Sequence, residues 1–119
     1  MMRNYMRMGF LVGTAVLLSA CVVQEKYHWG SYEQDLLTYY RDSDKETVLV
    51  TNLSEMITKG EENGKVPPGI YAEYGYLLLE SGQAKDSILF FTKEQETWPE
   101  STTLMSAMIR VAEGEAKKQ

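Results

Sequence analysis

Cysteine and histidine are almost absent from this chain of 119 residues, which has one Cys, at position 21, and one His, at position 28. A single Cys cannot form an intramolecular disulfide, and it excludes a structural zinc site built from a cluster of Cys. Basic residues are also few, because the chain beyond position 20 has ten Lys and Arg against seventeen Asp and Glu. Nucleic-acid phosphates are bound through Lys and Arg, so this balance argues against a nucleic-acid partner. The same balance leaves few basic side chains for binding anionic lipid.

Residue patterns typical of catalysis or of metal binding are missing as well. His28 has no Ser or Cys beside it in a recognisable motif, and the acidic residues at 42–46 and 61–62 lack the spacing of a calcium loop. The stretch "GEENGK" lacks the strand and the Ser or Thr that a phosphate-binding loop needs. We therefore expect a protein that is not an enzyme and that uses no cofactor and no metal.

A long uncharged run is present near the N-terminus. The seventeen residues "MGFLVGTAVLLSACVVQ" lie between Arg7 and Glu25 and follow the basic start "MMRNYMR". A membrane-spanning helix needs about 20 apolar residues, whereas a secretory signal needs a basic start, roughly 7 to 15 apolar residues and small residues before the cut. The run therefore predicts a signal peptide over residues 1–20. The alternative is a short N-terminal transmembrane anchor with an incidental Cys.

The end of this run resembles a bacterial lipobox, the motif read by signal peptidase II, in the residues Leu18, Ser19, Ala20 and Cys21. The resemblance implies that the Cys21 thiol receives a diacylglyceryl group, that cleavage follows Ala20, and that the new amine is acylated, for example with palmitate. Two or three acyl chains make a stable anchor in a bilayer. In Gram-negative lipoproteins an Asp after the lipidated Cys signals retention in the inner membrane, and here that residue is Val22. The resemblance therefore implies an outer-membrane anchor with a periplasm-facing domain.

Apolar residues recur at helical spacing after a lipidated Cys and tether at residues 21–30. Tyr32, Leu36 and Tyr40 lie on one face of a helix predicted for 31–41, which Ser31 can cap. Next, "SDKE" at 43–46 has the spacing of a capping box and predicts a helix that ends at Gly60.

Three further helices are predicted in the second half of the chain. One follows Pro67 and Pro68 and stops at Gly82, the next runs from Ala84 to Pro99, and the last begins after residue 101. The final residues "EGEAKKQ" are expected to fray. The predicted fold class is all-α, with about five helices in one domain over residues 31–119.

Residues 68–101 resemble a tetratricopeptide repeat, a helix-turn-helix unit of about 34 residues. In the first helix of the repeat, Tyr71 would take the aromatic position, Gly75 the small position and Leu78 the bulky position. Gly82 would lie in the turn between the helices. In the second helix, Ser87 would take the small position and Phe91 the aromatic position, and Pro99 would take the terminal Pro position. Tyr74 departs from the pattern in place of the usual Leu, and Glu94 departs in place of a small residue. The resemblance implies antiparallel helix pairs, with residues 31–60 as a degenerate first repeat and the last helix shielding the end of the stack.

The same resemblance implies a surface for a protein partner. The first helix of each such repeat lines a concave groove, where Tyr76, Leu79 and Glu80 would be candidates for binding a helix or an extended segment. Trp29 is a further candidate. The alternative is that the first helix pair covers the groove residues inside the domain, and that Trp29 packs on the first helix.

Two stretches, "YHWGSYEQDLLTYYRD" and "PPGIYAEYGYLLLESGQAKDSILFFTKE", together with the lipobox, resemble a family of small Gram-negative lipoproteins known only as a domain of unknown function. Members are encoded beside a lipoprotein related to the curli secretion channel and beside another small lipoprotein. This resemblance implies an adaptor or accessory subunit of a cell-envelope or secretion complex, with the channel-like lipoprotein as a possible partner.

Two other classes of function compete with the adaptor. One is an enzyme, above all one acting on peptidoglycan, with His28 and nearby carboxylates as acid and base. The other is a ligand carrier, which needs a deep apolar pocket that so small a helical stack can hardly supply.

Overall fold

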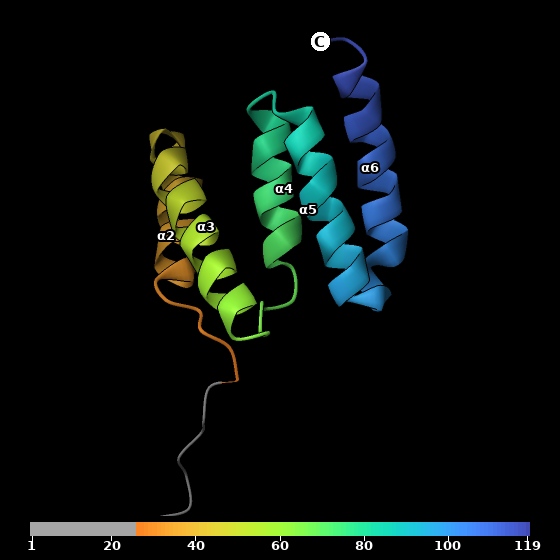
Figure 1. Ribbon diagram of the computed structural model, residues 1–119. Helices are drawn as coiled ribbons and strands as arrows, with labels where there is room; N and C mark the ends of the chain where they lie inside the picture. The colour runs from red at the N-terminus through yellow and green to blue at the C-terminus, as the bar shows by residue number, and fades with distance from the viewer. Residues whose placement is uncertain (1–25) are drawn as a thin grey trace, which may run out of the picture.

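Residues 26–119, the part of the chain that the computed structural model describes, fold into α-helices joined by short turns (Figure 1). The five helices are α2 (Tyr32–Arg41), α3 (Glu46–Glu62), α4 (Ile70–Glu80), α5 (Ala84–Thr97) and α6 (Thr102–Ala116), with 3-10 turns η2 (Ser43–Lys45) and η3 (Pro99–Ser101). No strand occurs in this range. The predicted all-α class with about five helices is therefore confirmed. The predicted signal peptide at 1–20, with its motif Leu18, Ser19, Ala20 and Cys21, lies outside the described residues.

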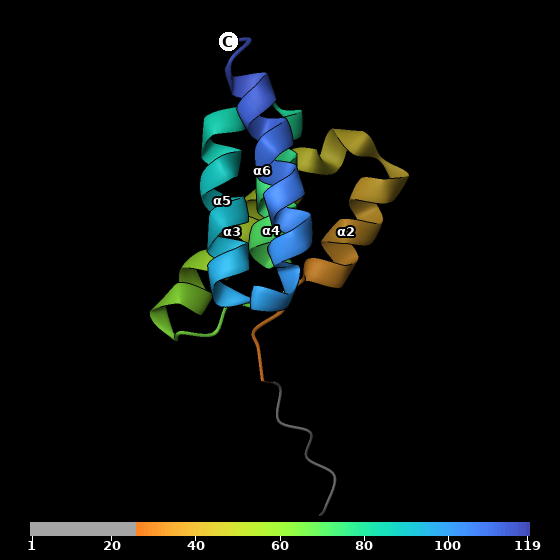
Figure 2. The same ribbon diagram turned by 90° about the vertical axis from the view of Figure 1, so that its right-hand side faces the viewer.

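Each helix packs beside its neighbour in the chain, α2 with α3, α3 with α4, α4 with α5 and α5 with α6. Viewed from the side, α5 lies to the left of α6 and α2 lies to the right, while α3 runs diagonally behind α4 (Figure 2). Helix α4 thus occupies the middle of the fold and has α2 and α6 on either flank of one face. None of the helices between residues 26 and 119 combines the length and the apolar character needed to cross a membrane.

The buried apolar side chains form two clusters. The first joins α3 to α4 and contains Leu49, Leu53, Met56, Ile57, Val66, Ile70, Tyr71 and Leu77. The second joins α5 to α6 and contains Phe91, Met105 and Ala112. Gly75 allows α4 and α5 to approach closely, because a Cβ at this position would lie 2.9 Å from both Cδ1 and Cε1 of Phe91.

The first two helices begin differently from the sequence expectation. Ser31 does not cap the backbone of α2, because its Oγ donates to the Asp35 carboxylate at 2.6 Å. The capping box predicted from Ser43 is also wrong. The chain makes a 3-10 turn before α3, and Asp42 caps that turn by accepting from the backbone N–H of Asp44 at 3.1 Å.

Two predicted helix ends fall short of the observed ones. Gly60 does not end α3, which continues to Glu62. Its missing side chain instead lets the following loop fold back, because a Cβ on Gly60 would lie 2.8 Å from Cγ2 of Val66. The Lys65 N–H donates to the Gly60 carbonyl at 2.7 Å in the same turn. At the C-terminus, α6 stays helical through Ala116 where fraying was expected.

Glu94 is buried, with 1 % of its surface exposed, and it replaces a missing helix cap. Helix α4 is preceded by Gly69, which has a φ of +86° and no side chain with which to cap. The Oε1 of Glu94, on α5, accepts from the Gly69 N–H at 2.8 Å. Burial raises the pKa of Glu94 above its ordinary value, against the lowering effect of the hydrogen bonds from the backbone of Gly69 and Ala72. The departure from a small residue at 94 thus fixes the start of α4.

Candidate functional site

A hollow with a volume of about 420 Å³ lies over the middle of α4, and we call it the α4 groove. Its lining residues are Tyr32, Leu36 and Tyr40 from α2, Ala72, Glu73 and Tyr76 from α4, Phe91 from α5, and Leu104, Met105 and Met108 from α6. Three large apolar side chains remain accessible there: Tyr76 is 45 % exposed, Leu104 63 % and Tyr40 78 %. The groove therefore presents an apolar, partly aromatic surface between α2 and α6.

Helices α2 and α4 are joined across the floor of this groove by a hydrogen bond. The Tyr32 hydroxyl donates to Oε2 of Glu73. Burial, followed by this hydrogen bond, raises the pKa of Tyr32 well above its ordinary value, so the phenol stays protonated and remains a donor. The contact holds the Glu73 carboxylate in the groove and sets the position of the first turn of α2 against α4.

A second hollow of about 520 Å³ adjoins the α4 groove at its Tyr32 end, and we call it the Trp29 hollow. Trp29, Gly30, Tyr32 and Glu33 line it, so Tyr32 belongs to both hollows. The Trp29 ring lies 5.7 Å from the ring of Tyr32, yet 37 % of Trp29 is exposed. Trp29 thus packs on the start of α2 with one part of its surface and leaves another part accessible.

Carboxylates provide the charge along these two hollows. Glu33 lines the Trp29 hollow and Glu73 lines the α4 groove, and among the described residues the lining of both includes no Lys, Arg or His. Beyond Tyr76, at the far end of α2, Glu46 and Glu80 lie close enough to Tyr39 to raise the pKa of its hydroxyl, although burial is the larger cause. Each of the two hollows therefore combines apolar side chains with one carboxylate.

The four residues predicted to bind a partner occupy different positions. Tyr76 lies in the α4 groove and is not covered by the first helix pair, while Trp29 lies in the adjoining hollow. Glu80 is exposed and does not line the groove. Leu79 does not line the groove, because it packs against the buried cluster between α5 and α6. The binding role of these residues stays a prediction.

Sequence reasoning missed most of the groove, above all the contributions of α2 and α6. Tyr40 and Leu104 fall on regular helical faces and are typical of core positions. Their exposure follows from the separation of α2 and α6, which depends on how the helices pack. The available signal was an excess of large apolar residues over what four interfaces between neighbouring helices can bury.

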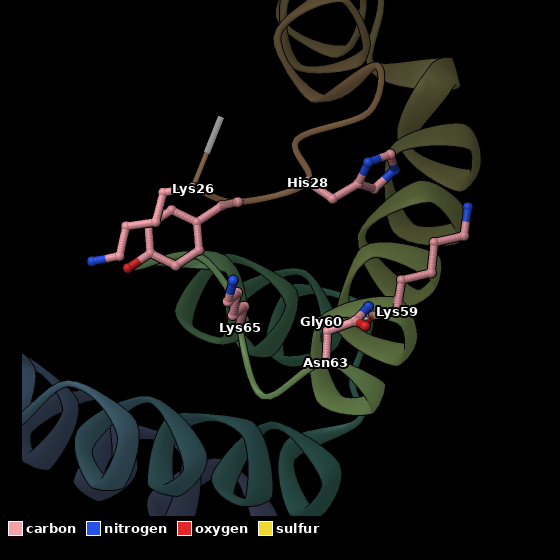
Figure 3. Close-up of a pocket in the computed structure, with 7 residues that line it drawn as sticks. Lys26, His28, Lys59, Gly60, Asn63 and Lys65 are labelled. Carbon is pink, nitrogen blue, oxygen red and sulfur yellow. Dashed lines mark hydrogen bonds between the residues drawn. The ribbon is translucent and has the colours of Figure 1, made fainter. Parts of the chain in front are cut away.

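His28, the residue of the enzyme hypothesis, lies in a hollow of about 360 Å³ among lysines (Figure 3). Its other lining residues are Lys26, Tyr27, Lys59, Gly60, Asn63 and Lys65. The amine of Lys26 points away from the imidazole (Figure 3). Glu55 is the one carboxylate in the adjoining hollow among the described residues. The Asp35 carboxylate accepts hydrogen bonds from Ser31 and Asn52, which also line that adjoining hollow. The enzyme hypothesis stays a prediction. Between residues 26 and 119, no three His, Cys, Asp or Glu side chains are placed to hold a metal ion.

The comparisons with known proteins identify a family without an assigned role. The model of the family described as "Domain of unknown function (DUF4810)" matches residues 26–108. No curated protein and no solved structure matches the chain. The matched range begins before the Trp29 hollow and includes every residue that lines the α4 groove. The likeness to tetratricopeptide repeats and the shared envelope assembly stay predictions.

Proposed function

We propose a function for this chain, which belongs to the family of the domain of unknown function DUF4810. It serves as a helical adaptor whose α4 groove binds a segment of another cell-envelope protein. The adaptor would be held at the outer membrane through acylated Cys21 and would face the periplasm. By the resemblance of its sequence to small envelope lipoproteins, the partner would belong to a secretion or envelope complex, with a lipoprotein like the curli secretion channel as the first candidate.

The observation that carries this proposal is the exposed apolar lining of the α4 groove. Large apolar side chains normally leave water, because burying one stabilises a protein by about 1.5–3 kcal/mol. Tyr40, Tyr76 and Leu104 nevertheless remain accessible around one hollow. Contiguous apolar patches on a small protein mark interaction sites, and tyrosine is enriched among the residues that dominate binding energy. A groove between helices suits a helix or an extended segment.

Lipid anchoring supports the adaptor role because it raises the local concentration of the domain at the membrane. The lipobox-like motif ends at Cys21, and the predicted tether with this Cys spans only residues 21–30. A tether of this length keeps the domain beside the bilayer. Confinement to a surface raises the effective concentration of the groove toward other membrane-bound proteins, so even a modest affinity gives stable occupancy.

Site-specific photo-crosslinking in intact cells tests the groove. A photo-reactive residue replaces Tyr76 in one variant and Leu89, on the outer face of α5, in the matched control, because the two side chains are similarly exposed at 45 % and 52 %. We expect a discrete crosslinked envelope protein from position 76 and not from position 89. Equal crosslinking at both positions, or none at 76, contradicts the proposal.

A separate experiment tests the anchor. Blocking lipoprotein signal peptidase should accumulate an uncleaved precursor, and Cys21→Ala should abolish incorporation of labelled palmitate. Normal maturation under the block would show that the chain is not processed as a lipoprotein. The two experiments measure different properties, because the block tests how the N-terminus is processed and the crosslink tests what contacts position 76.

A further inference from the structure

We infer that the segment bound in the α4 groove is cationic, with Lys or Arg side chains interleaved among the apolar residues that enter the groove. This inference rests on the proposed function and adds the chemistry of the partner. Its basis is the sign of the charges that accompany the apolar lining.

Each hollow has one carboxylate in its lining. Glu33 lies beside Trp29 in the Trp29 hollow, and Glu73 lies in the α4 groove. The Tyr32 hydroxyl holds the Glu73 carboxylate in place by donating to its Oε2. A cation that binds there meets an oriented acceptor and loses little entropy in forming the pair.

No basic residue of the described range lines the α4 groove or the Trp29 hollow. Arg41 on α2 and Arg110 on α6 are exposed and line neither hollow. Lys93 pairs with Glu61 at 2.7 Å, a contact between α5 and α3. Lys26, Lys59 and Lys65 surround the His28 hollow, which shares no lining residue with the α4 groove. An anionic segment would therefore meet unopposed carboxylates, and like charges brought together at an interface cost several kcal/mol. A neutral apolar segment would bury those carboxylates without a counter-charge, which is also unfavourable.

Two designed peptides provide the probe for this inference. Each is an amphipathic helix of about 18 residues with Leu on one face, and the polar face carries Lys in one peptide and Glu in the other. Binding to the purified full-length mature protein is followed by fluorescence anisotropy at low and high salt. We expect the Lys peptide to bind at least about tenfold more tightly than the Glu peptide, with a preference that shrinks as salt is added.

Variants then locate the effect on the protein. The double variant Glu33→Gln with Glu73→Gln should weaken binding of the Lys peptide by a factor of about ten, as expected for two partly exposed ion pairs. The control Glu96→Gln neutralises an exposed carboxylate on α5 that lines neither the groove nor the Trp29 hollow, and it should leave binding unchanged. Circular dichroism of each variant verifies that the helices remain folded.

The outcomes separate this inference from the proposed function. If Tyr76 crosslinks a partner in cells but the charge variants bind both peptides equally, the groove is a docking site and its cationic preference is refuted. If Tyr76→Ala leaves binding of the Lys peptide unchanged, the peptide does not use the groove and the inference fails. A crosslink from position 76 to a second copy of this chain would also overturn it, because the occupant would then be an acidic protein.

Discussion

Replacing Gly75 by Ala tests the close packing of α4 on α5, and the sign of its effect should depend on Phe91. In an open helix, Gly→Ala stabilises by up to about 1 kcal/mol, because Gly loses more backbone entropy on folding. At position 75 the new Cβ would lie 2.9 Å from two ring carbons of Phe91 and 3.3 Å from Cβ of Phe90. The Phe91 ring is buried, so it cannot swing into solvent to relieve the contact.

Overpacking of this kind costs about 1–3 kcal/mol, so the net effect of Gly75→Ala is a destabilisation on the order of 1 kcal/mol. The variant Phe91→Leu removes the ring atom Cε1 and should itself cost about 1–2 kcal/mol through lost burial. In that background Gly75→Ala should become neutral or stabilising. The two substitutions are therefore expected to couple by about 2 kcal/mol, within the range measured for residues in contact.

Urea unfolding followed by far-ultraviolet circular dichroism gives the four free energies of this cycle. Gly114→Ala provides the matched control, because Gly114 is also helical and a Cβ there would meet nothing within 4 Å. It should stabilise the protein by up to about 1 kcal/mol with either residue at 91. If Gly75→Ala in the wild-type background stabilises as much as Gly114→Ala, the close approach of Gly75 to Phe91 is wrong.

Two further predictions concern single side chains. Burial raises the pKa of Glu94 above its ordinary value of 4.5, so the folded state binds this proton more tightly than the unfolded chain does. The stability that Glu94 contributes through this proton is fully present below about pH 4.5 and is lost as pH rises through the folded-state pKa. Glu94→Gln should flatten this part of a plot of Tm against pH. An unchanged slope would contradict a raised pKa at Glu94. Tyr71→Phe removes the hydroxyl that donates to Oε1 of Glu61 at 2.9 Å. It should cost about 1 kcal/mol in urea unfolding. Glu61→Ala, which removes both this acceptor and the ion pair with Lys93, should cost more, and an equal cost for both would show that the ion pair contributes nothing.

The helices could be predicted because their signals are local. The stripe that includes Ile70, Tyr71 and Leu78 repeats at helical spacing, and Gly82 ends it in a left-handed turn with a φ of +83°. Helix starts were less predictable, since a Ser hydroxyl competes with other nearby acceptors. Ser31 bonds to a carboxylate one turn later, and the cap near Ser43 shifts by one residue to Asp42.

The groove could be predicted only in part, because it depends on distances between helices that are not adjacent in the chain. Tyr76 was found through the repeat-like register of α4 alone. Leu79 was misplaced because the contribution of α6 to the core was not known, and its side chain packs against that helix's cluster. Tyr40 and Leu104 approach the same hollow from opposite flanks, and no spacing within one helix encodes that relation.

Helix α2 connects the stability of the domain to occupancy of the groove. It has no fully buried residue, and it contacts the remainder through partly buried side chains such as Tyr32 and Leu36. Two polar contacts hold it, from Tyr32 to Glu73 and from the Asn52 amide to the Asp35 carboxylate at 2.6 Å. A segment lying between α2 and α6 would add apolar contacts to α2, the helix that has the fewest of them. Binding of the segment and the ordering of α2 should therefore stabilise each other.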